Sequence, residues 1–235
     1  MTCFPVIIKS VSPATVGRRR RQTMVKVIAF SGSRRSGGNI EKALAAVLAA
    51  TEAETELIRL AELDMRPCLA CLKCAANNRC VHRDDINPIL DKIRAADALI
   101  LGAFPTFASV NALTKTFMER IWPLRHNNIF TRGKIGASVV CAPLRPKELA
   151  DYFQLYFERY LETDYQGALI LKGVVPCLAC GFGETCQVSA LKILYGPDAA
   201  VSEDKFYDFD ASAEDQDAAR RLGQAVRTAI KAKIS

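Results

Sequence analysis

Four cysteines stand within thirteen residues at C-x2-C-x2-C-x5-C spacing, and they are Cys68, Cys71, Cys74 and Cys80. Four thiolates from one short loop can ligate an iron–sulfur cluster or a zinc ion. The residues between them are mostly small or polar, so the loop can wrap around a metal. Disulfides and metal-free thiols remain as alternatives, but the rest of the sequence indicates an intracellular protein, in which disulfides are rare.

A second candidate site is the segment SGSRRSGGN, residues 31–39, which lies between an apolar β-branched run and an apolar-periodic segment. Free N–H groups and the helix dipole at such a helix N-terminus favour a phosphate. Side chains in the segment can add hydrogen bonds or positive charge, and these are Ser33, Asn39, Arg34 and Arg35. The segment matches neither G-x-G-x-x-G nor the P-loop pattern, which argues against a dinucleotide or ATP site. A purely structural glycine-rich turn remains the alternative.

Three further cysteines, Cys177, Cys180 and Cys186, follow the last predicted strand, and Cys141 is a candidate fourth ligand. The alternatives are free cysteines and thiols packed at a subunit contact. The chain has no G-x-S-x-G motif, so a hydrolase has little support.

The elements that must position these residues alternate between strands and helices. Continuous apolar runs predict strands, and apolar residues three and four apart predict helices. The predicted strands are 25–31, 55–60, 96–103, 134–142 and 167–175, and the predicted helices are 40–50, 84–96, 109–122, 146–161 and 213–231. This pattern predicts an α/β fold, a doubly wound flavodoxin-like sheet of five parallel strands in the order 2-1-3-4-5. The cysteine-rich loop follows its second strand.

The distribution of charge and hydrophobicity limits the class of protein. Five of the seven net positive charges lie in residues 1–23, so the remainder, at +2, is too weakly basic for nucleic-acid binding. No segment approaches the roughly 20 apolar residues of a membrane span, and the apolar part of residues 1–23 precedes its arginines, the reverse of a secretory signal. We therefore expect a cytoplasmic protein with a disordered basic extension over residues 1–23, Met24 as an alternative start, and a single domain over residues 24–235.

Three segments, in the correct order, resemble a known family. SGSRRSGGNIEKAL resembles the phosphate loop of the NADPH-dependent FMN reductases, commonly SGSPRKGGNT followed by a helix. The cysteine loop, followed by an acidic cap, a helix and a strand, resembles the iron–sulfur flavoprotein branch of that family. ASVNALTKTFMER, residues 108–120, is similar to the helix that follows the loop contacting the isoalloxazine. The resemblance covers about residues 25–122.

The resemblance implies an FMN-binding domain and assigns its site residues. The FMN phosphate is assigned to Ser31, Ser33, Arg35, Gly38 and Asn39, with added charge from Arg34; the flavin ring to Phe104, Pro105, Thr106 and Phe107; and a [4Fe–4S] cluster to Cys68, Cys71, Cys74 and Cys80. The chain departs from the family pattern where Arg34 replaces a proline, where Ile40 replaces a hydroxyl residue, and where AFPTFAS replaces a loop like S-P-x-Y-F-G. The later loop, 141–150, lacks the glycines expected near the ring.

The implied function is an FMN-dependent oxidoreductase that passes electrons between NAD(P)H or a ferredoxin-like donor, FMN and the cluster, and on to an acceptor. No catalytic side chain is predicted, because the flavin carries the redox chemistry. In the family the cluster lies near a flavin across a subunit contact, which implies a homodimer or homotetramer. Two alternatives remain open: a flavin-only NAD(P)H:quinone or small-molecule reductase, and a zinc-binding non-enzymatic module.

Overall fold

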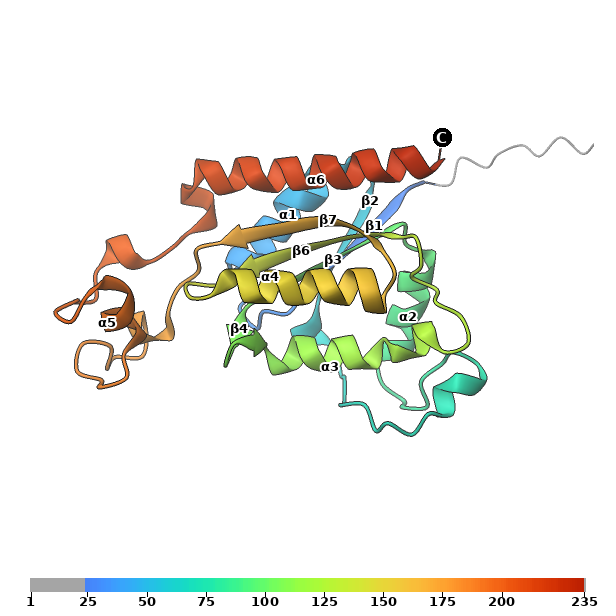
Figure 1. The fold of residues 1–235 in the computed structure, drawn as a ribbon, viewed down its shortest axis with the longest axis horizontal. Coiled ribbons are helices and arrows are strands. Elements are labelled where there is room, and N and C mark those ends of the chain that lie inside the picture. The colour runs from blue at the N-terminus through green and yellow to red at the C-terminus, as the bar shows by residue number, and fades with distance from the viewer. Residues whose placement is uncertain (1–23, 235) are drawn as a thin grey trace, which may run out of the picture.

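Five parallel strands form the central sheet in the computed structural model, which describes residues 24–234 (Figure 1). The strands are β1 (Lys26–Ser31), β2 (Glu54–Arg59), β3 (Ala98–Ala103), β6 (Ile135–Cys141) and β7 (Asp164–Leu171). Their order in the sheet is β2-β1-β3-β6-β7, and every neighbouring pair is parallel. Since β6 and β7 are the fourth and fifth strands of this sheet along the chain, the predicted 2-1-3-4-5 order is confirmed.

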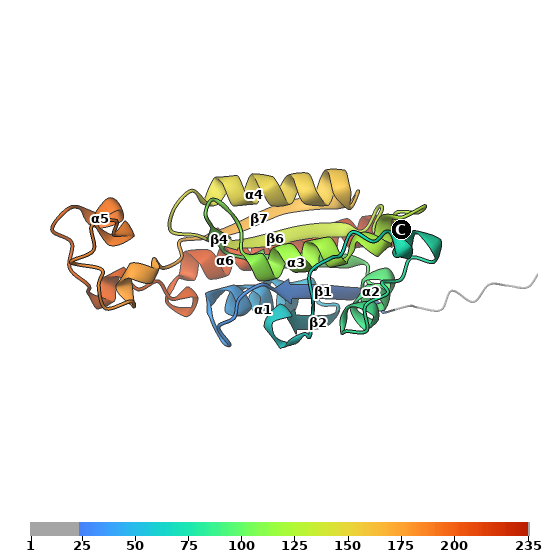
Figure 2. The same cartoon turned by 90° about the horizontal axis from the view of Figure 1, so that it is seen from below.

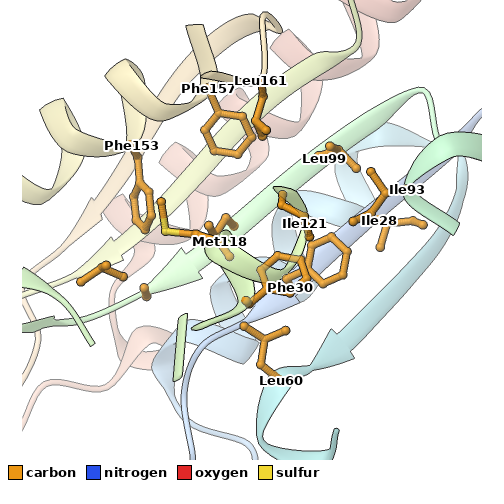
Figure 3. Close-up of a cluster of buried hydrophobic side chains, with 14 of the residues drawn as sticks. Ile28, Phe30, Leu60, Ile93, Leu99, Met118, Ile121, Phe153, Phe157 and Leu161 are labelled. Atoms are coloured by element: carbon orange, nitrogen blue, oxygen red, sulfur yellow. The ribbon is translucent and has the colours of Figure 1, made fainter. Parts of the chain in front are cut away.

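Helices cover both faces of the sheet (Figure 1). One face is covered by α1 (Asn39–Thr51) and α6 (Ala213–Ile234), and the other by α2 (Ile86–Ala95), α3 (Ala112–Arg120) and α4 (Pro146–Leu155). Successive side chains of a strand point to opposite faces, so each strand supplies both cores. In β1, Val27 and Ala29 pack towards α1 and α6, whereas Ile28 and Phe30 pack towards α2 and α3. Figure 3 shows the second core, with Phe30 beside Ile121 and Leu60.

Short elements complete the chain between these strands and helices. A two-stranded antiparallel hairpin, β4 (Pro105–Thr106) and β5 (Ser109–Val110), follows β3. The 3-10 turns are Leu60–Glu62, Lys73–Ala76, Trp122–Arg125, Pro176–Leu178, Glu203–Lys205 and Phe209–Ala211, and a π-helical turn spans Tyr156–Tyr160.

Two predicted boundaries are wrong for identifiable reasons. The helix predicted from residue 109 begins at Ala112, because the hairpin occupies the preceding residues. The strand predicted over 167–175 is β7, which starts and ends earlier than predicted. It pairs with β6 only as far as Leu171, because Gly173, at a φ of +68°, then turns the chain away from the sheet.

Residues 172–212 leave the sheet as an excursion that contains α5 (Ala190–Tyr195). Figures 1 and 2 show the excursion projecting from one end of the molecule, beyond the carboxyl end of β7. It has its own small apolar cluster of Val175, Leu178 and Leu191. The predicted basic extension, residues 1–23, lies outside the described residues. Within residues 24–234, none of the helices combines the length and apolarity that crossing a lipid bilayer requires.

Candidate functional site

The loop between β1 and α1, residues 32–38, is held in shape by the carboxylate of Glu41. Ser31, fully buried at the end of β1, donates from Oγ to Glu41 Oε1 at 3.3 Å, and the Gly37 N–H donates to Glu41 Oε2 at 2.8 Å. Arg59 Nε, from the end of β2, pairs with Glu41 Oε1 at 2.7 Å. This buried carboxylate, which no sequence pattern singles out, is therefore neutralised and fixes the path of the loop.

The same loop leaves several backbone N–H groups for a ligand. At this loop and the start of α1, the amides of Arg34, Ser36, Gly38, Asn39 and Ile40 have no acceptor within the described residues. They lie at or just before the start of α1, where the helix dipole attracts an anion. Arg34 and Arg35 are exposed and add positive charge. The arrangement suits a phosphate group.

The serine and asparagine side chains of the loop are already engaged. Ser33 Oγ accepts the Arg35 N–H at 3.1 Å. Asn39 Nδ2 donates to the Tyr207 carbonyl at 2.9 Å, and its Oδ1 accepts the Phe209 N–H at 3.0 Å. Asn39 therefore offers its backbone N–H to a ligand, while its side chain fastens α1 to the segment that returns from the excursion.

Replacing Asn39 with alanine is expected to weaken FMN binding about tenfold. Two hydrogen bonds of about 1 kcal/mol each are lost, and residues 207–209 are released from the start of α1. Asn39→Asp, which keeps the acceptor for the Phe209 N–H, should lose less. Titration of flavin fluorescence measures both affinities, and an unchanged value for Asn39→Ala would show that this tie plays no part in binding.

The four residues predicted to face the flavin ring form the hairpin after β3. Phe104 precedes it, Pro105 and Thr106 form β4, and Phe107 is its tip. Phe107 and Ala108 both have left-handed φ angles, +50° and +57°, which closes the two-residue turn at an energetic cost for residues other than glycine. The Phe107 ring is fully exposed. The hairpin thus presents an aromatic ring to a molecule bound at this edge.

Asn111, directly after the hairpin, ties it to the phosphate loop. Its Nδ2 donates to the Gly32 carbonyl at 3.0 Å, and its Oδ1 accepts the Thr114 hydroxyl at 2.8 Å. The Gly32 N–H in turn donates to the Gly102 carbonyl of β3 at 2.8 Å. The two predicted halves of a flavin site therefore lie side by side at the carboxyl ends of β1 and β3, where ligands bind in such sheets.

All four cysteines of the predicted quartet line one cavity of about 310 Å³. Cys68 and Cys71 are exposed, and Cys74 and Cys80 are half-buried. Burial raises the pKa of the Cys74 thiol, and negative charge on the other three thiols adds to the rise. Within residues 24–234, no three side chains of the metal-binding types are placed around a point that could hold one metal ion. The structure thus brings the quartet together around one cavity.

Asparagine side chains fasten the cysteine loop to the body of the protein. Asn87, on α2, exchanges two hydrogen bonds with the Cys80 backbone, at 2.9 and 2.8 Å. Asn78 Nδ2 donates to the carbonyls of Pro123 and His126, at 2.8 and 2.5 Å. Since these ties hold the backbone rather than the thiols, the sulfur atoms remain available as ligands.

A buried ion pair lies against the cavity. Arg120, at the end of α3, contacts Asp84 through both terminal nitrogens, at 2.6 and 2.9 Å. Their side chains are 1% and 2% exposed. Arg120 Nη2 also lies 3.3 Å from Cys80 Sγ. In the sequence, Asp84 is only the first residue of the helix predicted over 84–96, and no pattern singles out Arg120.

The second cysteine set does not gather around Cys141. Cys177 packs against the small cluster of the excursion, whereas Cys141 packs in the core beneath α1 and α6. Burial raises the pKa of Cys141 to about 11, as expected of a packed thiol. The suggestion that Cys141 completes this set has no support in the structure.

Comparison with known proteins agrees with this geometry. Residues 25–152, just over half of the chain, match the family model described as NADPH-dependent FMN reductase. An iron–sulfur flavoprotein of Methanocaldococcus jannaschii is 38% identical over 125 residues, which are 52% of this chain and 64% of the relative. One from Archaeoglobus fulgidus is 30% identical over 165 residues, which are 68% of this chain and 69% of the relative. The match to the first of these relatives thus spans less than two thirds of its length.

Solved structures of flavodoxin type share the fold of this chain. A solved flavodoxin from the domain Archaea superposes with a TM-score of 0.51 at 14% identity, over 88% of this chain and 99% of that one, a likeness of fold alone. The family match, the relatives and the fold confirm the family that the sequence predicts. The chain belongs to the NADPH-dependent FMN reductase family of oxidoreductases, and its relatives place it in the iron–sulfur flavoprotein branch.

Proposed function

We propose that the protein is an FMN-dependent oxidoreductase in which Cys68, Cys71, Cys74 and Cys80 hold a [4Fe–4S] cluster. Electrons would pass between a small reduced donor, NAD(P)H or a ferredoxin-like protein, FMN, the cluster and an acceptor. When bound, the flavin supplies hydride or single-electron chemistry and the cluster supplies single-electron chemistry. The observation that carries the proposal is the convergence of all four thiols on one cavity of about 310 Å³.

The proposed FMN site uses loop amides that have no acceptor within the described part of the chain. The uncommitted amides at the start of α1, with Arg34 and Arg35, would bind and neutralise the phosphate. The hairpin carrying Phe107 would cover the flavin ring and exclude water from it. Asn111 would keep the distance between the two parts constant, because it hydrogen-bonds both to the phosphate loop and within α3.

The shape of the cysteine cavity favours a cluster over a zinc ion. A structural zinc ion holds four ligands at about 2.3 Å from one point. A cluster places several atoms between its cysteine sulfurs, so its ligands surround a space. The four thiols of this chain line one cavity of about 310 Å³, which leaves room for such a group between them.

The separation of the two sites supports the proposed homodimer or homotetramer. The hairpin precedes the N-terminus of α3, whereas Arg120 and the cysteine cavity lie at its C-terminus. Nine helical residues separate the sites by about 12 Å along the axis. The excursion exposes Phe182, Val188 and Ile193, which suit a contact with a second subunit. A subunit contact could bring the cluster of one chain to the flavin of another.

Anaerobic purification of the chain should yield a brown protein with one FMN and about four irons and four sulfides per chain. The visible spectrum and chemical quantification of flavin, iron, sulfide and zinc measure this composition. A yellow protein with FMN and no iron would instead be the flavin-only quinone or small-molecule reductase. A colourless zinc protein without flavin would contradict both and leave the non-enzymatic module.

A further inference from the structure

The buried guanidinium of Arg120 is directed at the cysteine cavity as well as at its ion-pair partner. It makes two hydrogen bonds to Asp84, one to the Arg66 carbonyl at 2.5 Å, and one to Cys80 Sγ at 3.3 Å. Its Nε is buried and, within residues 24–234, has no hydrogen-bond partner. This fully buried arginine therefore contacts both the Asp84 carboxylate and a thiol of the cavity.

Asp84 is held ionised beside it. Its Oδ2 accepts the Arg66 N–H and its Oδ1 accepts the Ile86 N–H, each at 3.3 Å, in addition to the bonds from Arg120. Burial by itself would raise the pKa of the Asp84 carboxyl, but the hydrogen bonds and the charge of Arg120 outweigh it and keep the pKa below its ordinary value. Two opposite charges therefore stand next to the cavity, with the positive one against a ligand sulfur.

From this geometry we propose that Arg120 and Asp84 set the reduction potential of the cofactor that the four cysteines hold. The inference rests on the proposed function, because it concerns the cluster assigned to that cavity. Cluster potentials depend on net charge and on hydrogen bonds to the sulfurs. Reduction adds negative charge, so the Arg120 cation, in contact with Cys80 Sγ, favours the reduced form. The Asp84 anion, which pairs with the same guanidinium, opposes that effect.

Stability alone gives no reason for a pair of charges at this place. Apolar residues of similar volume often stabilise a core as well as a buried ion pair does, because both charges must be desolvated. The contact of Nη2 with Cys80 Sγ adds nothing to the pairing with Asp84. It places positive charge against one of the four thiols, which is what tuning of a bound cluster requires.

The test is a redox titration of the purified holoprotein, followed by visible and EPR spectra, for variants that change the two charges separately. Asp84→Asn removes the opposing anion and should raise the midpoint potential. Arg120→Gln removes the cation and should lower it. A tenfold change in the equilibrium constant for reduction, about 59 mV for a one-electron couple, is expected in each direction. Arg120→Lys, which keeps the charge, should stay nearer to the wild type than Arg120→Gln.

Two further variants keep the test decisive. Lys147→Gln, which changes an exposed charge on α4 away from the cavity, should leave the potential unchanged. If Arg120→Gln fails to fold because it strands the Asp84 anion, the double variant Asp84→Asn/Arg120→Gln removes both charges and should have a lower potential than Asp84→Asn alone.

A purely structural role would alter cluster content or stability without opposite shifts in potential. Unshifted potentials, or shifts of the same sign in Asp84→Asn and Arg120→Gln, would overturn the inference while leaving the proposed function in place. A wild-type protein that holds no iron would overturn both.

Discussion

Cys71→Ala is expected to lose nearly all cluster iron while retaining one FMN per chain. Cys71 is one of four thiols around the cavity, and a cluster that needs four cysteine ligands cannot be held stably by three. The backbone ties of the loop run through Asn78 and Asn87 and do not involve Cys71, so the fold should survive. The amides proposed for the phosphate belong to another loop, at the start of α1. Iron analysis and the flavin absorbance of the same sample measure both quantities.

The chain supplies a matched control for this variant. The string PCLAC occurs twice, at residues 67–71 and 176–180, and its second cysteine is Cys71 in one copy and Cys180 in the other. Both cysteines are exposed, but Cys180 lies on the excursion and does not line the cavity. Cys180→Ala should therefore keep its iron. Full iron in Cys71→Ala would refute the assignment of the quartet, and iron loss in Cys180→Ala would implicate the second cysteine set.

Gly32→Ala is expected to destabilise the protein by about 3 kcal/mol and to abolish FMN binding. A methyl group at Gly32 would overlap the Thr114 hydroxyl and would also lie 3.1 Å from the Gly102 carbonyl oxygen. Thr114 is fully buried, and its hydroxyl cannot move away without losing its bond to Asn111, which holds the Gly32 carbonyl. Overpacking of this kind costs about 1–3 kcal/mol, and the lost hydrogen bond adds about 1 kcal/mol. Denaturant unfolding measures the change in free energy.

Gly37→Ala, in the same loop, separates steric overlap from backbone strain. A Cβ at Gly37 would meet no atom within 4 Å, and only the φ of +64° disfavours it, at a cost of about 1 kcal/mol. Replacing Thr114 with alanine in the Gly32→Ala protein removes the overlapping hydroxyl and should recover part of the stability. Equal losses for the two glycine variants, or no recovery, would show that the fit between the loops is not what Gly32 provides.

The sequence by itself determined the features that depend on local pattern. Apolar runs marked the five strands of the sheet, and their alternation with helices was sufficient for the sheet order, because parallel strands joined by right-handed crossovers allow few arrangements. The spacing of Cys68 to Cys80 indicated a common ligand for the same reason, since residues within one short loop must lie near one another. The position of the phosphate loop followed from its place between a strand and a helix.

Tertiary structure decided the contacts between residues far apart in the sequence. Arg120 stands against Cys80, forty residues earlier, and Asn39 bonds to residues 207–209; no periodicity or spacing connects either pair. The hairpin of β4 and β5 was missed because two-residue strands are too short to show an alternating pattern. Glu41 was missed because a single acid in the first turn of a helix is common, and only the packing of β1, β2 and α1 buries it beneath the loop. Spacing could predict which residues share a ligand, but the charge that surrounds that ligand depends on which distant side chains the fold buries beside it.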